Sequence, residues 1–298
     1  MMIAIDIGNT TTSFGVFARP GSRDGRAGEG ARLRSQFSIA TQPWRTPDEV
    51  TLQLKALATS RRLHLTKAKQ IVLCSVVPRM ASVLTEALHS LKAVPIRIVG
   101  QDVFVPLKNR YAYPEQVGQD RLVGAYAAWK EFGAPQGQGA GGRGRGQDCI
   151  VADFGTAITI DIVKAGPRQT GSKGRGGEYL GGVIAPGLDI SLEALASRTA
   201  LLPKVELREP PELLGRDTAN SIRSGVLFGC VALCDGLVTQ LKRQYAPNAK
   251  VVATGGASPL IVKHSKTIDV LKPHLVLEGL YHLSLLPKPP QSKKSFKS

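Results

Sequence analysis

The sequence contains few residues of the kinds that bind structural metals or form disulfides. Among its 298 residues there are four cysteines and five histidines. They form no CxxC pair, no HExxH motif and no other Cys/His spacing typical of zinc ligands, so we expect no zinc site. Cys230 and Cys234 stand four residues apart in an apolar helical stretch. We expect both to be buried, reduced thiols.

Long apolar runs and an export signal are also absent. The apolar run from Met1 to Ile7 is interrupted by Asp6, follows no basic segment and precedes no small-residue cleavage site. No stretch reaches the roughly 18 apolar residues that cross a bilayer. These absences predict a cytoplasmic protein that makes no contact with a membrane.

Acidic residues are outnumbered by basic ones, which gives a formal net charge of +16. Such a charge raises nucleic acid or acidic small molecules as partners. Part of the excess lies in the tail 288–298, which carries Lys288, Lys293, Lys294 and Lys297. Aromatic residues make up only 5% of the chain, so no stacking platform for bases is evident. We therefore do not expect nucleic acid as a partner, and any binding would be nonspecific and salt-dependent.

Apolar strands and amphipathic helices alternate along the chain, which is typical of the α/β class. A helix is predicted from Thr46-Pro47, because a capping residue, a proline at the first helical position and early acids follow one another. A single long helix is predicted from Pro114 to Phe132. Further strands are predicted at 2–7, 12–17, 35–39, 70–75, 96–99, 149–152, 158–163 and 251–253, and further helices at 78–91, 191–197, 218–245 and 275–285.

The segment 133–147 is a low-complexity loop that is rich in glycine and carries two arginines; it is called the glycine/arginine loop below. Its composition is typical of a flexible connection. We therefore predict an N-terminal domain at 1–132, this loop, a C-terminal domain at 148–287 and a basic tail at 288–298.

Two short motifs occupy equivalent places in the two halves. Asp6-Ile7-Gly8-Asn9-Thr10 follows the first buried strand, and Asp153-Phe154-Gly155-Thr156-Ala157 follows the strand that begins the second half. A glycine-rich turn after a buried strand directs backbone N–H groups into one concavity, which suits phosphate oxygens. The adjacent hydroxyls of Thr10, Thr11 and Thr12 add donors, and the Asp6 carboxylate can hold Mg²⁺ directly or through its water shell. Together they predict a nucleotide site built from two hairpins.

The paired motifs resemble the phosphate-binding hairpins of the acetate and sugar kinase, Hsc70 and actin superfamily. That resemblance implies two ribonuclease H-like (actin-like ATPase) domains with ATP in the cleft between them. Gly255-Gly256 is similar to the superfamily's third element, the backbone turn against the adenosine.

A narrower resemblance appears at Tyr111–Arg121, where YAYPEQVGQDR is similar to the Tyr-x-x-Pro-Glu-x-Val-Gly-x-Asp-Arg segment of type III pantothenate kinases. Five further segments resemble the same family and follow the same order as in that family: IAIDIGNTTT, VADFGTAITID, YLGGVIAPGLDIS, DTANSIRSGVLFG and ATGGASPLI. The match therefore covers nearly the whole chain. It implies ATP-dependent phosphorylation of pantothenate, the first step of coenzyme A biosynthesis, by a homodimer.

The resemblance also implies a role for individual residues. Asp120 would be the general base, and Asp153 would bind the monovalent cation, K⁺ or NH₄⁺. ATP would be bound by Asp6, Ile7, Gly8, Asn9, Thr10, Thr11, Thr12, Ser13 and Thr156. Pantothenate would be bound by Tyr111, Gly118, Gln119, Asp120, Arg121 and Thr218, the last of these within the dimer.

The chemistry of phosphoryl transfer is consistent with these roles. The reaction needs an acceptor for the alcohol proton, which Asp120 can supply. The forked guanidinium of Arg121 can pair with the pantothenate carboxylate in a way that a lysine cannot.

Three alternatives remain at this point. A noncatalytic regulator similar to the Bvg accessory factor would suit the charge, but it would have no chemical reason to keep both Asp120 and Asp153. A kinase for a sugar or a carboxylate is opposed by the segment Gly118–Arg121. A nucleic-acid binder would use the glycine/arginine loops and the lysine-rich tail.

Overall fold

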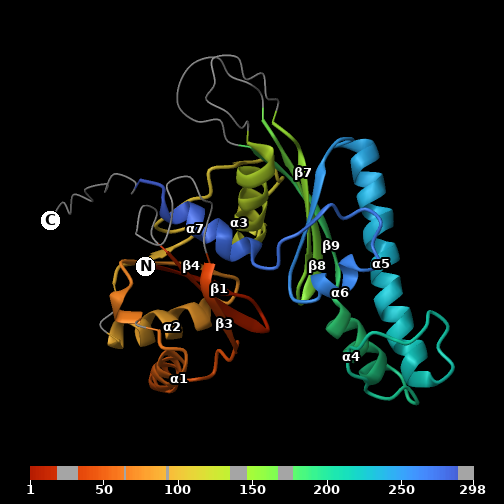
Figure 1. The fold of residues 1–298 in the computed structure, drawn as a ribbon, viewed down its shortest axis with the longest axis horizontal. Coiled ribbons are helices and arrows are strands. Elements are labelled where there is room, and N and C mark those ends of the chain that lie inside the picture. The colour runs from red at the N-terminus through yellow and green to blue at the C-terminus, as the bar shows by residue number, and fades with distance from the viewer. Residues whose placement is uncertain (19–32, 64, 92–93, 135–145, 167–176, 288–298) are drawn as a thin grey trace. The chain divides into compact units, whose positions relative to one another are not determined.

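A computed structural model describes residues 1–18, 33–63, 65–91, 94–134, 146–166 and 177–287. The chain divides into two compact units. Unit 1 comprises Met1–Val105 together with Leu277–Ser298, and unit 2 comprises Pro106–Val276 (Figure 1). Most of the predicted glycine/arginine loop and the whole basic tail lie outside the described residues.

Unit 1 is built on a five-stranded sheet with the order β3-β2-β1-β4-β5. Its strands are β1 (Met2–Ile7), β2 (Thr11–Phe17), β3 (Leu33–Ala40), β4 (Gln70–Ser75) and β5 (Ile96–Ile98). The first three strands are antiparallel, while β4 and β5 run parallel to β1. The central strands β1 and β4 are nearly continuous buried apolar runs, because both faces of the sheet are covered.

Helices cover both faces of this sheet. Helix α1 (Pro47–Ser60) begins with the predicted cap, in which Thr46 and Glu49 satisfy each other's backbone N–H groups. Together with α2 (Pro78–Ser90) it buries one core against residues such as Ile5 and Leu73. The other face receives α7 (Leu275–Ser284), whose Tyr281 ring stacks on Phe17 at 4.9 Å.

Unit 2 repeats the same strand order with one strand added. Its six-stranded sheet has the order β11-β10-β7-β8-β9-β6. The strands are β6 (Lys108–Asn109), β7 (Cys149–Phe154), β8 (Ala157–Lys164), β9 (Glu178–Pro186), β10 (Lys250–Thr254) and β11 (Val270–Leu271). Strands β7, β8, β9, β10 and β11 correspond in order and direction to β1–β5. The predicted α/β class with two ribonuclease H-like sheets is confirmed.

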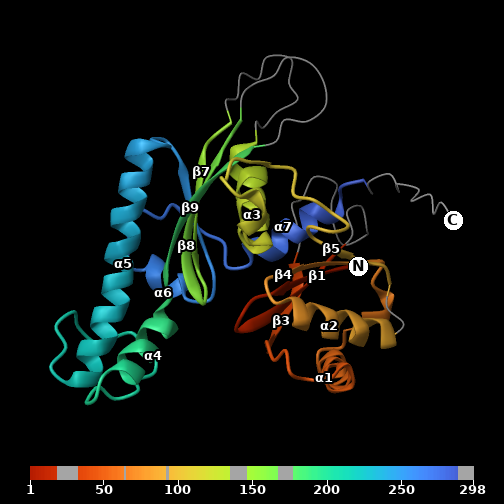
Figure 2. The ribbon, with the colours of Figure 1, turned by 180° about the vertical axis from the view of Figure 1, so that it is seen from behind.

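The helices of unit 2 pack on both faces of its sheet. Helix α3 (Gln119–Ala128) contacts β7 and β8. On the other face α4 (Leu188–Arg198), α5 (Thr218–Gln244) and α6 (Ser258–Val262) enclose the core of this unit, and α5 runs alongside the sheet in both views (Figures 1 and 2). Cys230 and Cys234 are buried in that core, as predicted.

The predicted helix from Pro114 to Phe132 is wrong at its start, and near its predicted end it changes from an α-helix to a π-helix. Pro114–Gln116 forms a short 3₁₀ turn. Val117 is then extended with its side chain buried, and α3 begins only after Gly118. At the other end, Trp129–Gly133 forms a π-helical turn in which the Trp129 indole donates to the carbonyl of Ala165. These tertiary contacts override the local helical pattern.

The two compact units also differ from the predicted domains. The sequence suggested one junction at 133–147, whereas the units divide after Val105 and again after Val276. Helix α3 belongs to unit 2 because it packs on β7 and β8, and the end of the chain returns to unit 1 through α7. No local composition marks either point.

One described helix, α5, is long and apolar enough to cross a membrane by those criteria alone. This differs from the expectation that no such stretch exists. The core helix of a soluble protein passes the same test, and α5 packs Leu227, Cys234 and Val238 into the core of unit 2.

Candidate active site

In unit 1 the turn between β1 and β2 is held by backbone and hydroxyl groups. The Gly8 N–H donates to the carbonyl of Thr11 at 3.0 Å. Thr41, which follows β3, donates from its backbone N–H to the Thr10 carbonyl and from its hydroxyl to the Gly8 carbonyl at 2.8 Å. The turn is therefore fixed by a residue that directly follows a third strand, which favours a preorganised binding loop.

The residues of this turn differ in what they can offer a ligand. Asn9, Thr10 and Thr11 are exposed, and Gly8 and Ser13 are half-buried. Ile7 and Thr12 are fully buried, and the Thr12 hydroxyl pairs with that of Thr41 at 2.9 Å. The Thr12 hydroxyl therefore lies inside the fold and is already paired, and its expected contact with ATP stays a prediction.

In unit 2 the turn between β7 and β8 is surrounded by glycines. A Cβ atom on Gly255, which has φ +91°, would lie 2.3 Å from Oδ1 of Asp153. A Cβ atom on Gly187, which precedes α4, would lie 2.2 Å from the Thr156 carbonyl oxygen. Only glycine allows these two backbone segments to approach the turn so closely. The second hairpin and the Gly255-Gly256 turn, predicted separately, thus meet in one place.

Asp153 stands at the end of β7 on the side of the sheet that faces α3. Burial and the nearby carboxylates of Asp120 and Asp161 raise its pKa to about 7. A carboxylate with those neighbours is stabilised by a bound cation, so Asp153 fits the predicted role.

Asp120 lies in the first turn of α3. Its Oδ1 accepts a hydrogen bond from the backbone N–H of Arg121 at 2.8 Å. Burial raises the pKa of Asp120, although the N–H and the charge of Arg121 offset part of the rise. Gly118 occupies the N-cap and Gln119 the first helical position, and both are half-buried. The helix start therefore presents a carboxylate that is a stronger base than an exposed aspartate.

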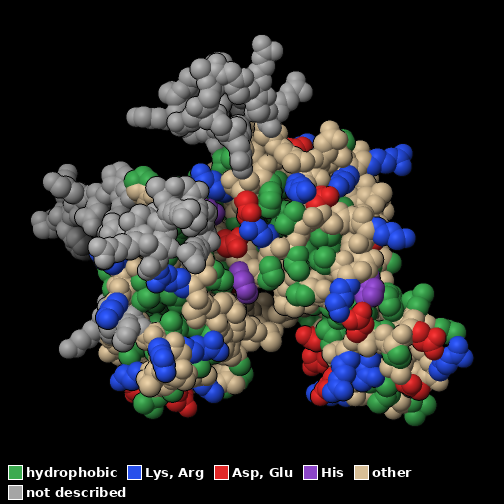
Figure 3. Space-filling view, in the orientation of Figure 1, with side chains coloured by type: hydrophobic (Ala, Val, Ile, Leu, Met, Phe, Trp, Pro, Cys, Tyr) green, Lys and Arg blue, Asp and Glu red, His purple; other side chains and the backbone are tan. Residues whose placement is uncertain are grey.

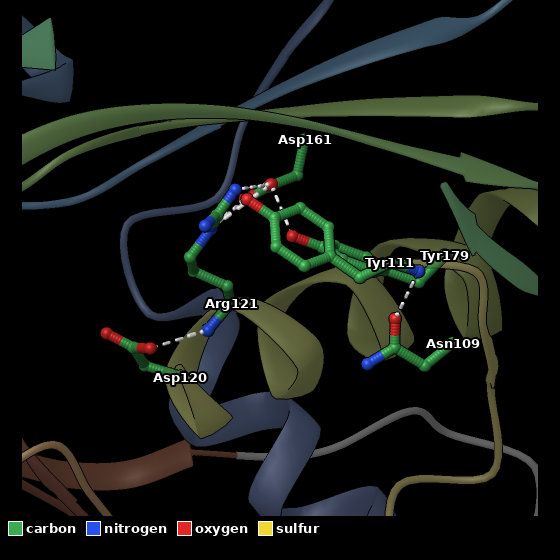
Figure 4. A network of polar contacts seen from close by, with 6 residues as sticks. All are labelled: Asn109, Tyr111, Asp120, Arg121, Asp161 and Tyr179. Carbon is green, nitrogen blue, oxygen red and sulfur yellow. Dashed lines mark hydrogen bonds and ion pairs between the residues drawn. The ribbon is translucent and has the colours of Figure 1, made fainter. Parts of the chain in front are cut away.

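Arg121 points from α3 to β8, where it forms a two-pronged ion pair with Asp161. Its Nε lies 3.2 Å from both carboxylate oxygens, and its Nη2 lies 2.5 Å from Oδ1. The side chain of Arg121 is 10% exposed and that of Asp161 is 2% exposed. The Tyr179 hydroxyl donates to the same Oδ1 at 2.7 Å (Figure 4).

Tyr111 lies next to this ion pair. Its backbone N–H donates to the side-chain oxygen of Asn109 at 3.0 Å. Its ring lies 6.5 Å from that of Tyr179, tilted by 43°, and packs over Gly181 (Figure 4). Tyr111 thus lies near Arg121 in unit 2, and the pantothenate-binding role expected for both stays a prediction.

Thr218 lies on a different element of unit 2 from Tyr111, Asp120 and Arg121. It is the first residue of α5, is exposed, and lines an open apolar groove of about 530 Å³ between α4 and α5. No hydrogen bond between described residues joins it to Tyr111, Asp120 or Arg121. Around this end of unit 2, Figure 3 shows charged side chains of both signs interspersed with apolar ones.

Three residues of these sites were not predicted. Asp161 and Tyr179 lie inside two of the family-like segments, VADFGTAITID and YLGGVIAPGLDIS. Neither segment assigns them a role, because Thr41, Asp161 and Tyr179 act through neighbours that are far away in the sequence. A further signal was the charge of Asp161 within the largely apolar, buried strand Ala157–Lys164.

Comparisons with known proteins agree on one family. A family model of type III pantothenate kinases matches residues 2–240. A type III pantothenate kinase of Rubrobacter xylanophilus is 39% identical over 292 residues, which cover 96% of this chain and 98% of the relative. Those of Anaeromyxobacter dehalogenans and Moorella thermoacetica are 36% and 35% identical over 280 residues, covering 94% of this chain and 97% of each relative.

A solved structure from Campylobacter jejuni, of a conserved protein assigned to the Baf family of transcriptional activators, has a similar fold. The TM-score is 0.52 at 18% sequence identity, and the match covers 94% of this chain and 96% of that one. At this identity the likeness concerns the fold alone.

Proposed function

The chain belongs to the type III pantothenate kinase family, and on that premise we propose that it transfers the γ-phosphoryl group of ATP to the primary alcohol of pantothenate. The product is 4′-phosphopantothenate, for coenzyme A biosynthesis. The main observation behind the proposal is the arrangement at the start of α3. There the Asp120 carboxylate, whose pKa is raised, and the Arg121 guanidinium lie near the Tyr111 ring.

The proton of the alcohol passes to Asp120. As the alcohol oxygen bonds to the γ-phosphorus, the bond between that phosphorus and the oxygen of the leaving ADP breaks. Asp120 has a raised pKa, so it accepts the proton more readily than an ordinary aspartate does. Arg121 binds the carboxylate at the other end of pantothenate, and Tyr111, Gly118 and Gln119 line the same substrate site.

The turn of unit 1 binds phosphate oxygens of ATP. Backbone N–H groups and exposed side chains from Asn9 to Thr11 serve as donors, while Ile7, Gly8, Thr12 and Ser13 support the turn and the strand ends. Thr156 contacts ATP from the turn of unit 2. Asp6 would hold Mg²⁺, directly or through its water shell, and Asp153 would hold K⁺ or NH₄⁺. When bound, these cations would neutralise charge on the phosphate oxygens.

We also propose that the protein is a cytoplasmic homodimer that pairs through α5. The apolar groove between α4 and α5 ends at Thr218, which would then approach the pantothenate site of the partner subunit. Leu233 lines that groove and is half-buried. Leu233→Asp should therefore yield monomers in sedimentation velocity and impair pantothenate binding, and an unchanged dimer would contradict the interface.

The function is tested by mixing the purified protein with ATP, Mg²⁺, K⁺ and pantothenate and detecting 4′-phosphopantothenate by mass spectrometry. We expect product that depends on both substrates, and more of it with K⁺ or NH₄⁺ than with Na⁺. A folded protein that hydrolyses ATP or binds DNA but forms no phosphopantothenate under any of these cations would refute the proposal.

A further inference from the structure

Burial of the ion pair between Arg121 and Asp161 adds little net free energy to folding. Both side chains are nearly removed from water, and the loss of hydration commonly cancels the Coulombic gain of a buried pair. Apolar side chains of similar volume would stabilise the same place at least as well. Stability alone therefore does not explain why this part of the α3–β8 contact is charged.

The surroundings of Asp161 are shaped to keep its carboxylate in one orientation. Burial raises the pKa of Asp161, and the bonds from Arg121 and Tyr179 offset part of that rise. On β9, the residue directly opposite is Gly182. A Cβ atom on Gly182 would lie 2.4 Å from Oδ1 of Asp161, so any other residue would displace the carboxylate.

The same strand also seats the ring of Tyr111. The register of β8 and β9 shifts next to Val163, and Gly181 has φ +119° there. A Cβ atom on Gly181 would lie 3.1 Å from the Tyr111 ring. In the segment 179–182, Tyr179 thus contributes a hydroxyl, Gly181 makes room for the Tyr111 ring, and Gly182 makes room for the Asp161 carboxylate.

Asp161 leaves one side of the guanidinium available. It occupies Nε and Nη2 of Arg121, while Nη1 makes no hydrogen bond to any residue that the structure describes. A guanidinium held along one edge cannot turn, so its remaining N–H groups keep a fixed direction. A fixed donor pair favours a planar carboxylate over a neutral group of similar size.

We propose that Asp161, assisted by the Tyr179 hydroxyl, is a positioning residue that orients Arg121 for recognition of the pantothenate carboxylate. This inference rests on the proposed function, and it adds that carboxylate selectivity originates in a pair of residues that do not touch the substrate.

The test compares pantothenate with its alcohol analogue, in which CH₂OH replaces the carboxylate. Affinities for both are measured by calorimetry, and kcat/KM is measured in parallel, for the parent protein, Asp161→Asn and Tyr179→Phe. In Asp161→Asn we expect the preference for pantothenate over the alcohol to fall about 10- to 100-fold, the size of one bond to a charged group. Tyr179→Phe should change it in the same direction by less.

Asp148→Asn is the matched control, because it removes a carboxylate that pairs with Lys164 elsewhere in unit 2. It should leave the preference within about twofold of the parent value. If Asp161→Asn weakens both ligands equally, its role is structural and the inference fails. Should Asp161→Asn not fold, an unchanged preference in Tyr179→Phe would overturn the inference.

The parent protein separates this inference from the proposed function. Selective binding of pantothenate without phosphorylation would contradict the kinase while the variants still decide the role of Asp161. Equal binding of both ligands by the parent would show that the carboxylate is not recognised, and would overturn the inference.

Discussion

The two units use equivalent positions of their central hairpins for different purposes. In unit 1, Gly15 pairs with Ala4, two residues before the strand-end Asp6. In unit 2, Asp161 pairs with Val151, two residues before the strand-end Asp153. Each position faces a helix that covers its own sheet. Gly15 meets the apolar side chain of Leu277 from α7, whereas Asp161 meets Arg121 from α3.

This difference indicates where stability and where chemistry are located. Apolar packing of α7 on the sheet of unit 1 removes surface from water and needs no partner groups. The α3 contact in unit 2 contains a buried ion pair, a half-buried carboxylate at Asp120 and a further one at Asp153. A face that carries several buried charges is a candidate for substrate and cation binding.

The contrast between the two units is tested most strongly by substitutions that make the α3 contact of unit 2 apolar, as the α7 contact of unit 1 is. Arg121→Met alone leaves Asp161 buried without its cation and should lower the free energy of unfolding by about 3–5 kcal/mol. Adding Asp161→Leu should restore most of that loss, since an apolar pair replaces the ionic one, yet pantothenate turnover should stay lost. Urea unfolding and the product assay measure the two effects. A double variant that keeps full turnover would contradict the functional assignment of the pair.

A smaller effect is expected at the glycine turn beside Asp153. Gly255→Ala places a methyl group against Asp153 and Phe154 at a positive φ. It should lower the free energy of unfolding by about 1–3 kcal/mol. Gly256→Ala is the matched control, because its Cβ atom would meet nothing within 4 Å. It should stay within about 0.5 kcal/mol of the parent. Equal effects of the two substitutions would show that the close approach is not required.

The smallest effect is expected in unit 1. Thr41→Val removes the hydroxyl that donates to the Gly8 carbonyl and pairs with Thr12. We expect a loss of about 1 kcal/mol in unfolding free energy and a higher KM for ATP, with the KM for pantothenate unchanged. Thr51→Val is the control, because it removes a buried hydroxyl that donates to the Ala87 carbonyl, away from the turn. A KM for ATP that does not move would separate Thr41 from the phosphate turn.

The sequence predicts most of the strands because each is a short apolar run between turn residues. The strand Gln70–Ser75 agrees with the structure at both ends, and β1 does so as well. The long strand β9 was not predicted, and Gly181 and Gly182 interrupt the apolar pattern that would indicate it. Those glycines are present for close packing against Tyr111 and Asp161, which only the folded chain shows.

The site was predictable as far as the motifs extend. Tyr111, Asp120 and Arg121 are close in sequence, so a local motif identifies them. The partners that orient them are joined by sheet register and helix packing, as with Asp161, which is 40 residues from Arg121. Unit boundaries were missed for the same reason, since α7 returns to the first sheet from the end of the chain.

The central claim is that Asp120 accepts the proton of the pantothenate alcohol. It is tested most directly by single-turnover phosphoryl transfer from ATP to pantothenate in Asp120→Asn, with Asp148→Asn as the control. The account predicts a rate about 10²- to 10⁴-fold below the parent for Asp120→Asn, with pantothenate still bound. A rate equal to that of the parent would contradict the assignment of Asp120 as the general base.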